Sequence, residues 1–325
     1  MKTRVAVIRG GIGSEYEVSL KSGASVLASL PNQKYQPVDV LITRDGQWHA
    51  GGMPIRPQDL NKVADVAFIA LHGEYGEDGT IQKILDDLNF PYTGSGRISS
   101  ALGMDKVASK KIFTEAGIKV PYGLLLSRAE IEEAAKKVFY KIPPPWVIKP
   151  NDKGSSVGLY FARTFAELTE ALDKAFAMAD NVLVEEYIRG REATCGVVDD
   201  FRREKYYALL PIEIVRPGTC PIWNYDDKYS GATEEICPGR FSDEESREIQ
   251  RLSRLIHESL SLRHYSRSDF ILSPRGIYAL EVNTLPGLTP ESLLPKSISA
   301  VGCEYGHFLD HLVNLALSGK TGMMS

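Results

Sequence analysis

The sequence predicts an α/β protein that begins with a doubly wound, mostly parallel sheet. The chain opens with an apolar run at residues 4–8, a glycine-rich turn at residues 10–13 and a helical spacing of apolar side chains over residues 18–30. Further apolar runs at residues 37–42 and 66–71 alternate with helical patterns. This alternation is typical of parallel strands that are joined by crossover helices.

The elements after this first sheet follow from their start and stop signals. Residues 105–116 have a helical pattern, and Gly117 is placed to end that helix. Three pairs of residues have the spacing of a capping box, with which a helix begins: Ser127 with Glu130, Thr164 with Glu167, and Ser242 with Glu245. We expect strands at residues 146–149, 182–186, 192–198 and 205–215.

The length of 325 residues suggests two or three domains. We expect an N-terminal domain over residues 1–96, a central subdomain over residues 97–187 and a C-terminal subdomain over residues 188–325. The last of these should carry the metal and substrate site, because it contains the most informative cluster of acidic residues.

Composition narrows the class of protein and its partners. The chain is 43% hydrophobic and 25% charged, which indicates a globular rather than a disordered protein. Its net charge of −4 offers no basic field for nucleic acid. No stretch approaches the roughly 18 apolar residues of a membrane span. Four cysteines without a Cys-x-x-Cys pair fit a reducing compartment, so we expect a cytoplasmic protein without membrane contact.

Two strands in the C-terminal third predict a hairpin. They cover residues 268–273 and 277–283, and the short connection between them ends in Gly276, which can take the left-handed turn conformation. If Ser273 lies opposite Ile277, the two strands pair in a register that brings their acidic residues together.

That hairpin is a candidate metal site. In the expected register Asp269 faces Glu281, and Asn283 shares their face because side chains alternate along a strand. Three oxygen-bearing side chains suit Mg²⁺ that is held together with substrate phosphates. The alternative is a solvated face of charged strand residues. The apolar neighbours in both strands favour burial, and buried carboxylates normally need a cation.

A metal site of this kind is explained if the protein binds nucleotide phosphates, so a phosphate-binding loop is expected elsewhere in the chain. The chain has no Walker A motif, and Tyr16 stands where a dinucleotide fingerprint would have its third glycine. Lys149, at the end of an expected strand, is followed by a loop that contains Gly154, Ser155 and Ser156. Glycine allows close backbone approach and lysine supplies charge, although the same pattern also fits an ordinary glycine-serine turn.

Several blocks of sequence together resemble the D-alanine–D-alanine ligases. In the N-terminal half they are residues 10–20, 71–80, 92–95 and 104–106, and in the C-terminal half residues 149–158, 185–192, 227–229, 267–269 and 281–287. The resemblance covers nearly the whole chain. The order and spacing of these blocks make it specific, where any single block would be weak.

The resemblance implies the fold and the reaction. The N-terminal domain would be followed by two α+β subdomains of the ATP-grasp type, with ATP held between them. One D-alanine carboxylate would take the γ-phosphoryl group, and the amine of a second D-alanine would displace phosphate, giving D-alanyl-D-alanine for peptidoglycan precursors. Two Mg²⁺ or Mn²⁺ ions would be required and K⁺ is a further candidate ion. Relatives also suggest a homodimer formed through the first domain.

The resemblance also carries roles for individual residues. The metal ligands would be Asp269, Glu281 and Asn283. The residues matched to ATP binding are Lys106, Lys149, Ser155, Ser156, Glu185, Glu186, Ile188, Glu192, Lys228 and Asn283. At Glu186 many relatives have Lys, and we expect the adenine contact there to use the backbone.

Substrate roles follow in the same way. Glu15 would hold the ammonium of the first D-alanine with His72 nearby, while Ser292 and Leu293 would receive the carboxylate of the second. Arg267 and the backbone N–H of Gly287 would stabilise the tetrahedral oxyanion. Ser155 and Tyr229 would join Glu15 in a hydrogen-bonded set that closes a loop over the site, and Tyr229 favours an amine over a hydroxyl nucleophile.

Other interpretations stay open from the residues alone. Glu15 could be a helix N-terminal charge, and Lys106 could be one of several solvated lysines together with Lys110. His257 and His264 are expected at a solvated helix end. Two further functions are weighed: another ATP-grasp ligase, such as one making D-alanyl-D-lactate, and a nucleotide-binding regulatory protein. The retained metal ligands and lysines argue against the regulator, and Tyr229 argues against the ester-forming ligase.

Overall fold

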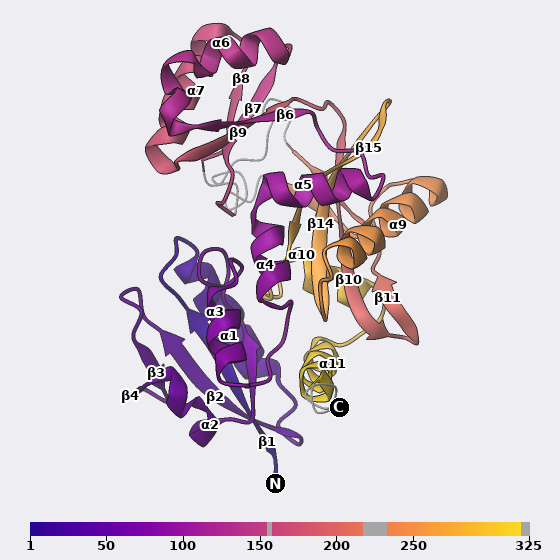
Figure 1. The fold of residues 1–325 in the computed structure, drawn as a ribbon. Helices are drawn as coiled ribbons and strands as arrows, with labels where there is room; N and C mark the ends of the chain where they lie inside the picture. The colour runs from indigo at the N-terminus through magenta and orange to yellow at the C-terminus, as the bar shows by residue number, and fades with distance from the viewer. Residues whose placement is uncertain (155–157, 217–232, 320–325) are drawn as a thin grey trace.

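The computed structural model describes residues 1–154, 158–216 and 233–319 of the chain. These residues form three sheets in an α/β arrangement. The N-terminal sheet and the sheet of β6 to β9 lie at opposite ends of the molecule, and the third sheet lies between them (Figure 1). Within the described ranges, no helix is long and apolar enough to cross a membrane.

The N-terminal sheet has the strand order β4-β3-β2-β1-β5. Its elements are β1 (Thr3–Gly10), α1 (Tyr16–Ser29), β2 (Tyr35–Ile42), β3 (Trp48–Ala50), β4 (Met53–Ile55), η1 (Pro57–Asp59), α2 (Leu60–Val63), β5 (Val66–Ile69) and α3 (Thr80–Asp87). The strand β1 pairs in parallel with both β2 and β5, which confirms the predicted core of the sheet. The antiparallel strands β3 and β4 were not predicted, because three residues are too few to show a periodic pattern.

The middle part of the chain builds an antiparallel sheet with the order β6-β9-β7-β8. Its elements are α4 (Arg97–Met104), α5 (Lys106–Glu115), β6 (Gly123–Ser127), η2 (Arg128–Glu130), α6 (Ile131–Lys141), β7 (Trp146–Pro150), β8 (Tyr160–Ala162), α7 (Phe165–Met178) and β9 (Asn181–Glu186). The helices α6 and α7 share a core with the sheet, centred on the fully buried Trp146.

The third sheet has the order β13-β12-β10-β14-β15, with β11 paired to β10. Its elements are β10 (Arg191–Phe201), β11 (Glu204–Ala208), β12 (Ile212–Val215), β13 (Glu234–Ile236), α9 (Asp243–Ser259), β14 (Tyr265–Ser273), β15 (Gly276–Asn283), α10 (Leu293–Ala300) and α11 (Tyr305–Ser318). The single strand predicted over residues 205–215 is wrong, because the chain leaves the sheet at residues 209–211. Pro211 in this break has no N–H to donate to a sheet.

Most of the predicted helix ends are confirmed by their hydrogen bonds. Capping boxes form at Ser127 with Glu130 and at Ser242 with Glu245. At the start of α7, Thr164 accepts from the Glu167 N–H, but the Glu167 carboxylate accepts from the N–H of Arg163 rather than from that of Thr164. The Thr164 capping box is therefore only half formed.

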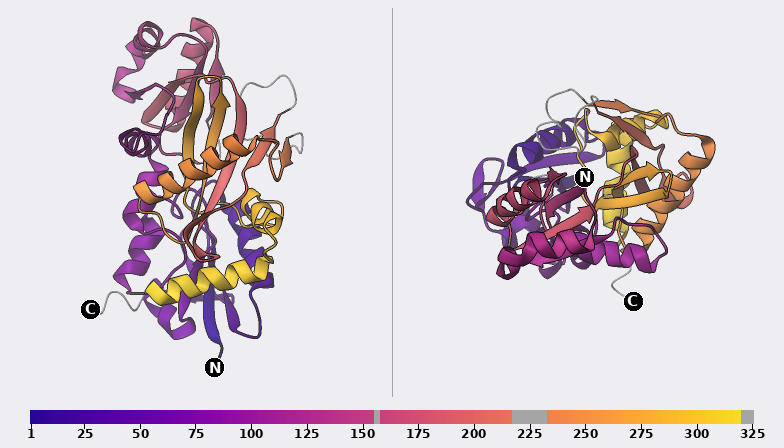
Figure 2. Two further views of the ribbon diagram at one scale, coloured as in Figure 1. Left: turned by 90° about the vertical axis from the view of Figure 1, so that its right-hand side faces the viewer. Right: turned by 90° about the horizontal axis from the view of Figure 1, so that it is seen from above.

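One hydrophobic core connects the two ends of the chain. Phe308 and Leu312 of α11 are fully buried in the same cluster as Val7 and Phe68 of the N-terminal sheet, and Leu285 joins them. Figure 2 shows α11 crossing beside the N-terminal strands. The predicted boundaries at residues 96 and 187 stay a prediction, since this core draws side chains from both sides of them.

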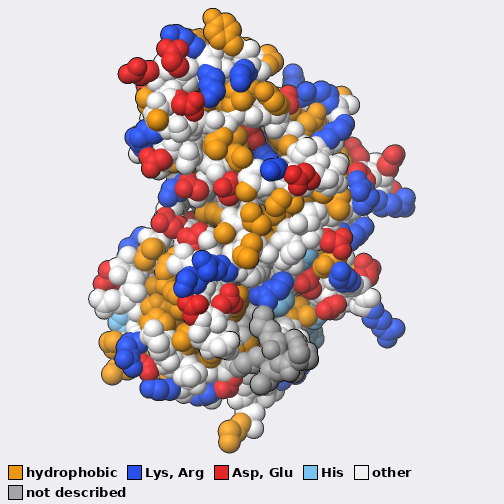
Figure 3. All heavy atoms as spheres, in the orientation of Figure 1, with side chains coloured by type: hydrophobic (Ala, Val, Ile, Leu, Met, Phe, Trp, Pro, Cys, Tyr) orange, Lys and Arg blue, Asp and Glu red, His pale blue; other side chains and the backbone are white. Residues whose placement is uncertain are grey.

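Charged side chains are mixed on the surface. On the face drawn in Figure 3, Lys and Arg alternate with Asp and Glu, and no large area carries a single sign. This distribution agrees with the net charge of −4.

Two histidines expected at a solvated helix end are buried, so that expectation is wrong. His257 is fully buried, with Nε2 at 2.8 Å from a carboxylate oxygen of Asp199 and Nδ1 at 2.8 Å from the Ser266 hydroxyl. His264 is 8% exposed, and its Nδ1 accepts a hydrogen bond from the N–H of Gly94 at 3.0 Å. The nearby arginines suggested that these histidines face solvent, but the face of α9 that carries His257 packs against the third sheet.

Burial of His264 predicts a dependence of stability on pH. Burial, with the nearby charge of Arg263, lowers the pKa of His264 from 6.5 to about 4, against the opposing charge of Asp199. The unfolded chain therefore takes up a proton below about pH 6.5, whereas the folded chain does so only near pH 4. Stability from this site is complete above pH 6.5 and is lost as the pH falls toward 4, by about 2 kcal/mol between pH 7 and pH 5.

The variant His264→Asn isolates this contribution from those of the other ionisable side chains. Asn does not titrate, offers an oxygen acceptor near the place of Nδ1, and tolerates the φ of +66° found here. Urea titrations at pH 7 and pH 5 should show a smaller acid loss in the variant than in the wild type. Equal losses in the two proteins would contradict the assignment.

Candidate active site

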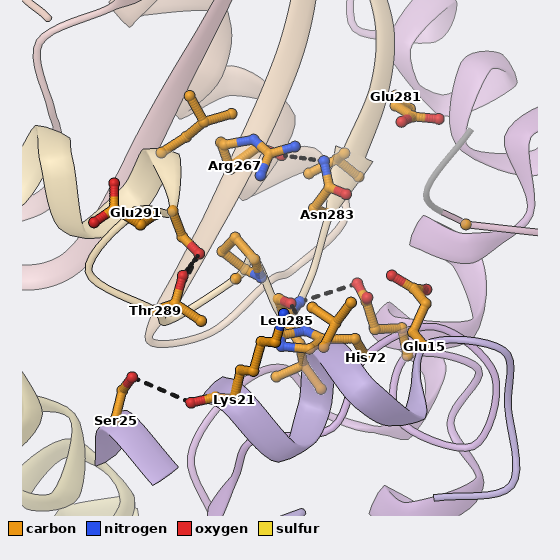
Figure 4. A pocket seen from close by; sticks show the side chains of 18 of the residues that line it. Glu15, Lys21, Ser25, His72, Arg267, Glu281, Asn283, Leu285, Thr289 and Glu291 are labelled. Carbon is orange, nitrogen blue, oxygen red and sulfur yellow. Dashed lines mark hydrogen bonds between the residues drawn. The ribbon is translucent and has the colours of Figure 1, made fainter. Parts of the chain in front are cut away.

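A cavity of about 650 Å³ opens where the N-terminal sheet meets the third sheet (Figure 4). Its walls come from the start of α1, the loop after β5, the paired strands β14 and β15, and the loop over residues 285–293. Many of the predicted site residues line this one cavity: Glu15, His72, Lys106, Arg267, Glu281, Asn283, Gly287, Ser292 and Leu293. The structure therefore brings together residues that are up to 278 positions apart in the sequence.

The first wall carries Glu15 at the N-cap of α1. Glu15 is 8% exposed, and a Cβ at Gly73 would lie only 2.2 Å from one of its carboxylate oxygens. Gly73 also has a φ of +61°, which disfavours any other residue. The loop after β5 can approach Glu15 this closely only because residue 73 is glycine.

His72 is held in place by a hydrogen-bond partner at each ring nitrogen. Its Nδ1 lies 2.8 Å from the carbonyl oxygen of Leu285, which can only accept, so Nδ1 carries the proton. Its Nε2 lies 2.7 Å from the hydroxyl oxygen of Ser22. Both ring nitrogens are thus occupied, and His72 ties the loop after β5 to residue 285 instead of acting as a free base.

The β14–β15 hairpin has a different register from the expected one, but the same acidic pair results. Ser273 pairs with Gly276, and not with Ile277 as predicted. A register shift between Asp269 and Phe270 then moves the pairing by one residue, so that Asp269 faces Glu281. The predicted facing of the two carboxylates is confirmed, although the turn geometry from which it was inferred is wrong.

Asp269 is the centre of a buried hydrogen-bond network. It is 8% exposed and accepts from Nε and Nη2 of Arg267, each at 3.0 Å, and from the amide of Asn283 at 3.1 Å. The Thr194 hydroxyl donates to the same carboxylate at 2.5 Å. Burial opposes the charge of Arg267, but the Asp269 carboxylate outweighs burial and raises the pKa of Arg267, so the guanidinium stays cationic.

The residues at this hairpin fit a hard divalent cation. Asp269 and Glu281 supply two carboxylates on one face, and the Asn283 amide nitrogen points to Asp269, which leaves its carbonyl oxygen for another partner. Over the described ranges, no three Asp, Glu, His or Cys side chains gather into a closed metal cluster. Such an open set suits Mg²⁺, which normally keeps phosphate and water among its ligands.

A lysine-rich cluster lies next to the hairpin. Nζ of Lys106 donates to the carbonyl oxygen of Lys153 at 2.6 Å and lies 3.8 Å from Glu281. Lys149 contacts Glu185 at 2.9 Å, and Lys110 contacts the other oxygen of the same carboxylate. Lys106 and Lys110 are nearly buried, so the solvated alternative for them is wrong.

The Glu185 carboxylate contacts both lysines, but the pKa values of the two lysines shift in opposite directions. Burial lowers the pKa of Lys110 to about 7, only partly offset by Glu185. Burial also opposes the charge of Lys149, but Glu185 and Glu281 outweigh it and raise the pKa of Lys149. Lys149 is therefore the firmly charged member of the cluster. The sequence indicated Lys149 but missed the part played by Lys110, whose only signal was its position one turn after Lys106.

The remaining residues matched to ATP lie apart from the residues that line the cavity. Glu186 accepts from Arg275 at 2.9 Å and from the N–H of Tyr122, so its side chain is engaged in structural contacts. Ile188 is buried in a small apolar cluster with Ile271 and Tyr278, and Glu192 contacts Arg216. Ser155, Ser156, Lys228 and Tyr229 lie outside the described residues.

The opposite end of the cavity is built around the start of α10. A Cβ at Gly287 would lie 2.7 Å from the hydroxyl oxygen of Ser292, so this approach also requires glycine. Ser292 is the N-cap of α10, and its hydroxyl contacts that of Thr289 at 2.8 Å. Leu293 begins the helix, and its backbone N–H is one of those without a partner inside the helix. Hydroxyl and N–H groups at this end suit a carboxylate.

Sequence reasoning missed other residues that line or support the cavity. Lys21 and Ser25 follow Glu15 along α1 and reach the cavity at helical spacing. Thr194 supports Asp269 from the neighbouring strand, and Glu77 lines the cavity beside Glu15. The signal for Glu77 was present, since it lies in the block of residues 71–80, but no role followed from the sequence.

Comparisons with known proteins agree over nearly the whole chain. A family model described as "D-ala D-ala ligase C-terminus" matches residues 112–314, and one described as "D-ala D-ala ligase N-terminus" matches residues 4–54 and 52–95. The chain is 38% identical to the D-alanine–D-alanine ligase of Syntrophobacter fumaroxidans, over 97% of this chain and 98% of that protein.

Solved structures are similar in fold. The VanG D-Ala:D-Ser ligase from Enterococcus faecalis has a TM-score of 0.85 at 30% identity and covers 97% of this chain and 100% of its own. The D-alanine–D-alanine ligase from Bacillus anthracis complexed with ATP has a TM-score of 0.80 at 32% identity, with 99% of each chain covered.

Proposed function

The chain belongs to the D-alanine–D-alanine ligase family, and we propose that the cavity described above is where it joins its two amino acids. The protein is an ATP-dependent ligase that forms D-alanyl-D-alanine, ADP and phosphate through a D-alanyl phosphate. The observation that carries the assignment of the site is the meeting of Glu15, Arg267, Glu281 and Ser292 in one cavity, with Asp269 paired to Glu281 behind it. We propose that the dipeptide serves peptidoglycan precursor synthesis.

In the first step, the carboxylate of one D-alanine attacks the γ-phosphorus of ATP and ADP leaves. Glu15 holds the ammonium of this D-alanine, at a place that Gly73 keeps open. Lys149 and Lys106 lie where they can neutralise the phosphates, and binding of ATP gives Lys149 a second anion beside Glu185. The transferred group carries dispersed charge, so positioned cations are the main source of catalysis.

In the second step, the amine of the second D-alanine attacks the acyl carbon and phosphate leaves. Arg267 and the N–H of Gly287 stabilise the oxyanion that forms in between. The Ser292 hydroxyl and the Leu293 N–H hold the carboxylate of this second molecule at the start of α10. The two substrates thus bind at opposite ends of the cavity, with the reacting atoms near the β14–β15 hairpin.

Bound divalent ions would supply positive charge that stabilises the phosphates of ATP during transfer. Asp269, Glu281 and Asn283 would hold them. We expect a chelator such as EDTA to abolish D-alanine-dependent ADP release, and Mg²⁺ or Mn²⁺ in excess to restore it. Exchange of K⁺ for Na⁺ in the same assay tests whether K⁺ contributes. Full activity after exhaustive chelation would contradict the metal proposal.

The function is tested by ADP release with ATP and D-alanine, with the product identified by mass spectrometry. L-alanine, and D-alanine mixed with D-serine or with D-lactate, are the parallel substrates. D-serine is included because a similar structure is that of a D-Ala:D-Ser ligase. A dipeptide of two D-alanines as main product is expected. ADP release only with another acceptor would overturn the proposed second substrate.

We also propose a cytoplasmic location and a homodimer. The location is supported by the use of ATP and by the cysteine pattern, and the dimer is supported by the resemblance to relatives that pair through the first domain. Sedimentation analysis of the purified protein, which distinguishes a 35.9 kDa monomer from a dimer, tests the second proposal.

A further inference from the structure

Glu77 makes a connection that the reaction steps above do not use. It lies in the loop after β5, four residues after Gly73, and it lines the cavity together with Glu15. One of its carboxylate oxygens accepts from the N–H of Gly73 at 3.1 Å. The other accepts from the N–H of Thr284 at 3.0 Å, the N–H of Leu285 at 3.1 Å and the Thr284 hydroxyl at 3.2 Å.

These hydrogen bonds join two segments that are about 200 residues apart in the chain. The first segment, residues 72–77, shapes the place of the first D-alanine through Gly73. The second, residues 284–285, directly follows Asn283 and leads to Gly287. His72 also joins the first segment to the second, because its Nδ1 donates to the carbonyl oxygen of Leu285. Glu77 and His72 therefore bond to the two backbone groups of Leu285, one to its N–H and the other to its C=O.

Burial raises the pKa of Glu77 above its ordinary value, and the nearby charge of Glu15 adds to this rise. His72 and the donating N–H groups offset it only in part. The Glu77 oxygens accept from the N–H groups of Gly73, Thr284 and Leu285 and from the Thr284 hydroxyl, and such donors stabilise an ionised carboxylate. An ammonium group that binds at Glu15 adds a positive charge next to this pair of carboxylates and relieves their repulsion.

We propose that Glu77 is a positioning residue that couples the first D-alanine pocket to the segment that stabilises the oxyanion. Its carboxylate holds residues 73 and 284–285 at a fixed separation, so that the D-alanyl phosphate forms where Arg267 and Gly287 can act on it. This inference rests on the proposed function and adds a role that acts between the two steps.

The test compares the full reaction with its first half in the variant Glu77→Gln. The first half is measured by trapping with hydroxylamine, whose nitrogen attacks the acyl carbon of D-alanyl phosphate. The carbon–oxygen bond to phosphate breaks, and D-alanyl hydroxamate, inorganic phosphate and a proton result. Trapping needs only the first D-alanine, whereas dipeptide formation needs both. D-alanine is kept low enough to favour the first site.

In Glu77→Gln the amide can accept at only one position, so one of the two segments loses its bonds. Loss of a charge-assisted bond predicts that dipeptide formation falls by about 10- to 100-fold. We expect hydroxamate formation to fall clearly less, and the KM for ATP to stay within about twofold, because the Lys149–Glu185 pair is not in contact with Glu77.

Two further variants keep the test decisive. Thr284→Val removes one donor to Glu77 with little change of shape, and should shift the ratio of dipeptide to hydroxamate in the same direction by a smaller factor. Asp78→Asn is the matched control, since among the described residues Asp78 accepts from the N–H of Tyr75 in its own loop and from that of Thr80 at the start of α3. It should leave that ratio unchanged.

A parallel fall of both activities in Glu77→Gln, or no fall in either, would overturn the coupling role. The same parallel fall in Thr284→Val would do so if Glu77→Gln does not fold. These outcomes differ from failure of the proposed function, in which the wild type itself would release no ADP on addition of D-alanine.

Discussion

The variant Asp269→Asn is expected to lower the kcat for D-alanyl-D-alanine formation by about 10³-fold. The carboxylate of Asp269 faces Glu281 across the hairpin and accepts from Arg267, Asn283 and Thr194. An amide at this position removes one of the two carboxylates that we propose as metal ligands, and it turns an N–H group toward other donors. Turnover should fall at every Mg²⁺ concentration, and the Mg²⁺ needed for half-maximal activity should rise.

The cost to stability must be separated from the cost to catalysis. An amide that faces donors leaves buried groups unpaired, which costs about 1–3 kcal/mol. Glu213→Gln is the matched control, because Glu213 is also a buried carboxylate of the third sheet, contacting Arg240 at 2.8 Å. We expect the control to lose stability but to keep its kcat. If Asp269→Asn releases ADP as fast as the wild type at ordinary Mg²⁺ concentrations, Asp269 is not a metal ligand.

The variant Arg267→Lys is expected to lower kcat by about 10²-fold, with a much smaller change in the KM for ATP. Lysine keeps the positive charge but cannot make the paired bonds from Nε and Nη2 to Asp269, each at 3.0 Å. The cation would then lie away from the position that our proposal assigns to the oxyanion. A fall in kcat without a change in ATP binding is the signature of an interaction made in the transition state.

A second arginine provides the control for this prediction. Arg240→Lys alters an arginine–carboxylate pair in the same sheet, with Glu213, and should leave kcat close to that of the wild type. The double variant of Arg267 and Asp269 should lose less than the product of the two single losses, because these side chains are in contact. More than half of the wild-type kcat in Arg267→Lys would contradict the oxyanion role.

Local signals in the sequence predicted the regular elements well. The helix α9 begins at Ser242 because its hydroxyl and the Glu245 side chain satisfy backbone N–H groups within four residues of each other. The strands β1 and β5 were recognisable as short apolar runs. Such features depend on neighbours in the chain, so they can be read without knowing the fold. The three-residue strands β3 and β4 were too short to give this signal.

The register of the β14–β15 hairpin was not predictable from the local sequence alone. The expected turn with Ser273 opposite Ile277 did not form, and a bulge beside Asp269 restored the facing of Asp269 and Glu281. A bulge adds one residue to one strand, and its position depends on packing across the sheet rather than on the turn. The facing of Asp269 and Glu281 was predicted from the sequence, whereas the turn and the bulge that produce it were not.

The sequence by itself determined the residue types of the site and their order along the chain, which were specific enough to indicate the family and its reaction. Only the tertiary structure decided which charged groups are buried, with which partners. Lys110 resembled a solvated helix lysine and His264 a surface histidine, yet both are buried by segments distant in the chain. Burial and pairing depend on contacts between such segments, and Glu77, which bonds to residues 284 and 285, is the clearest case.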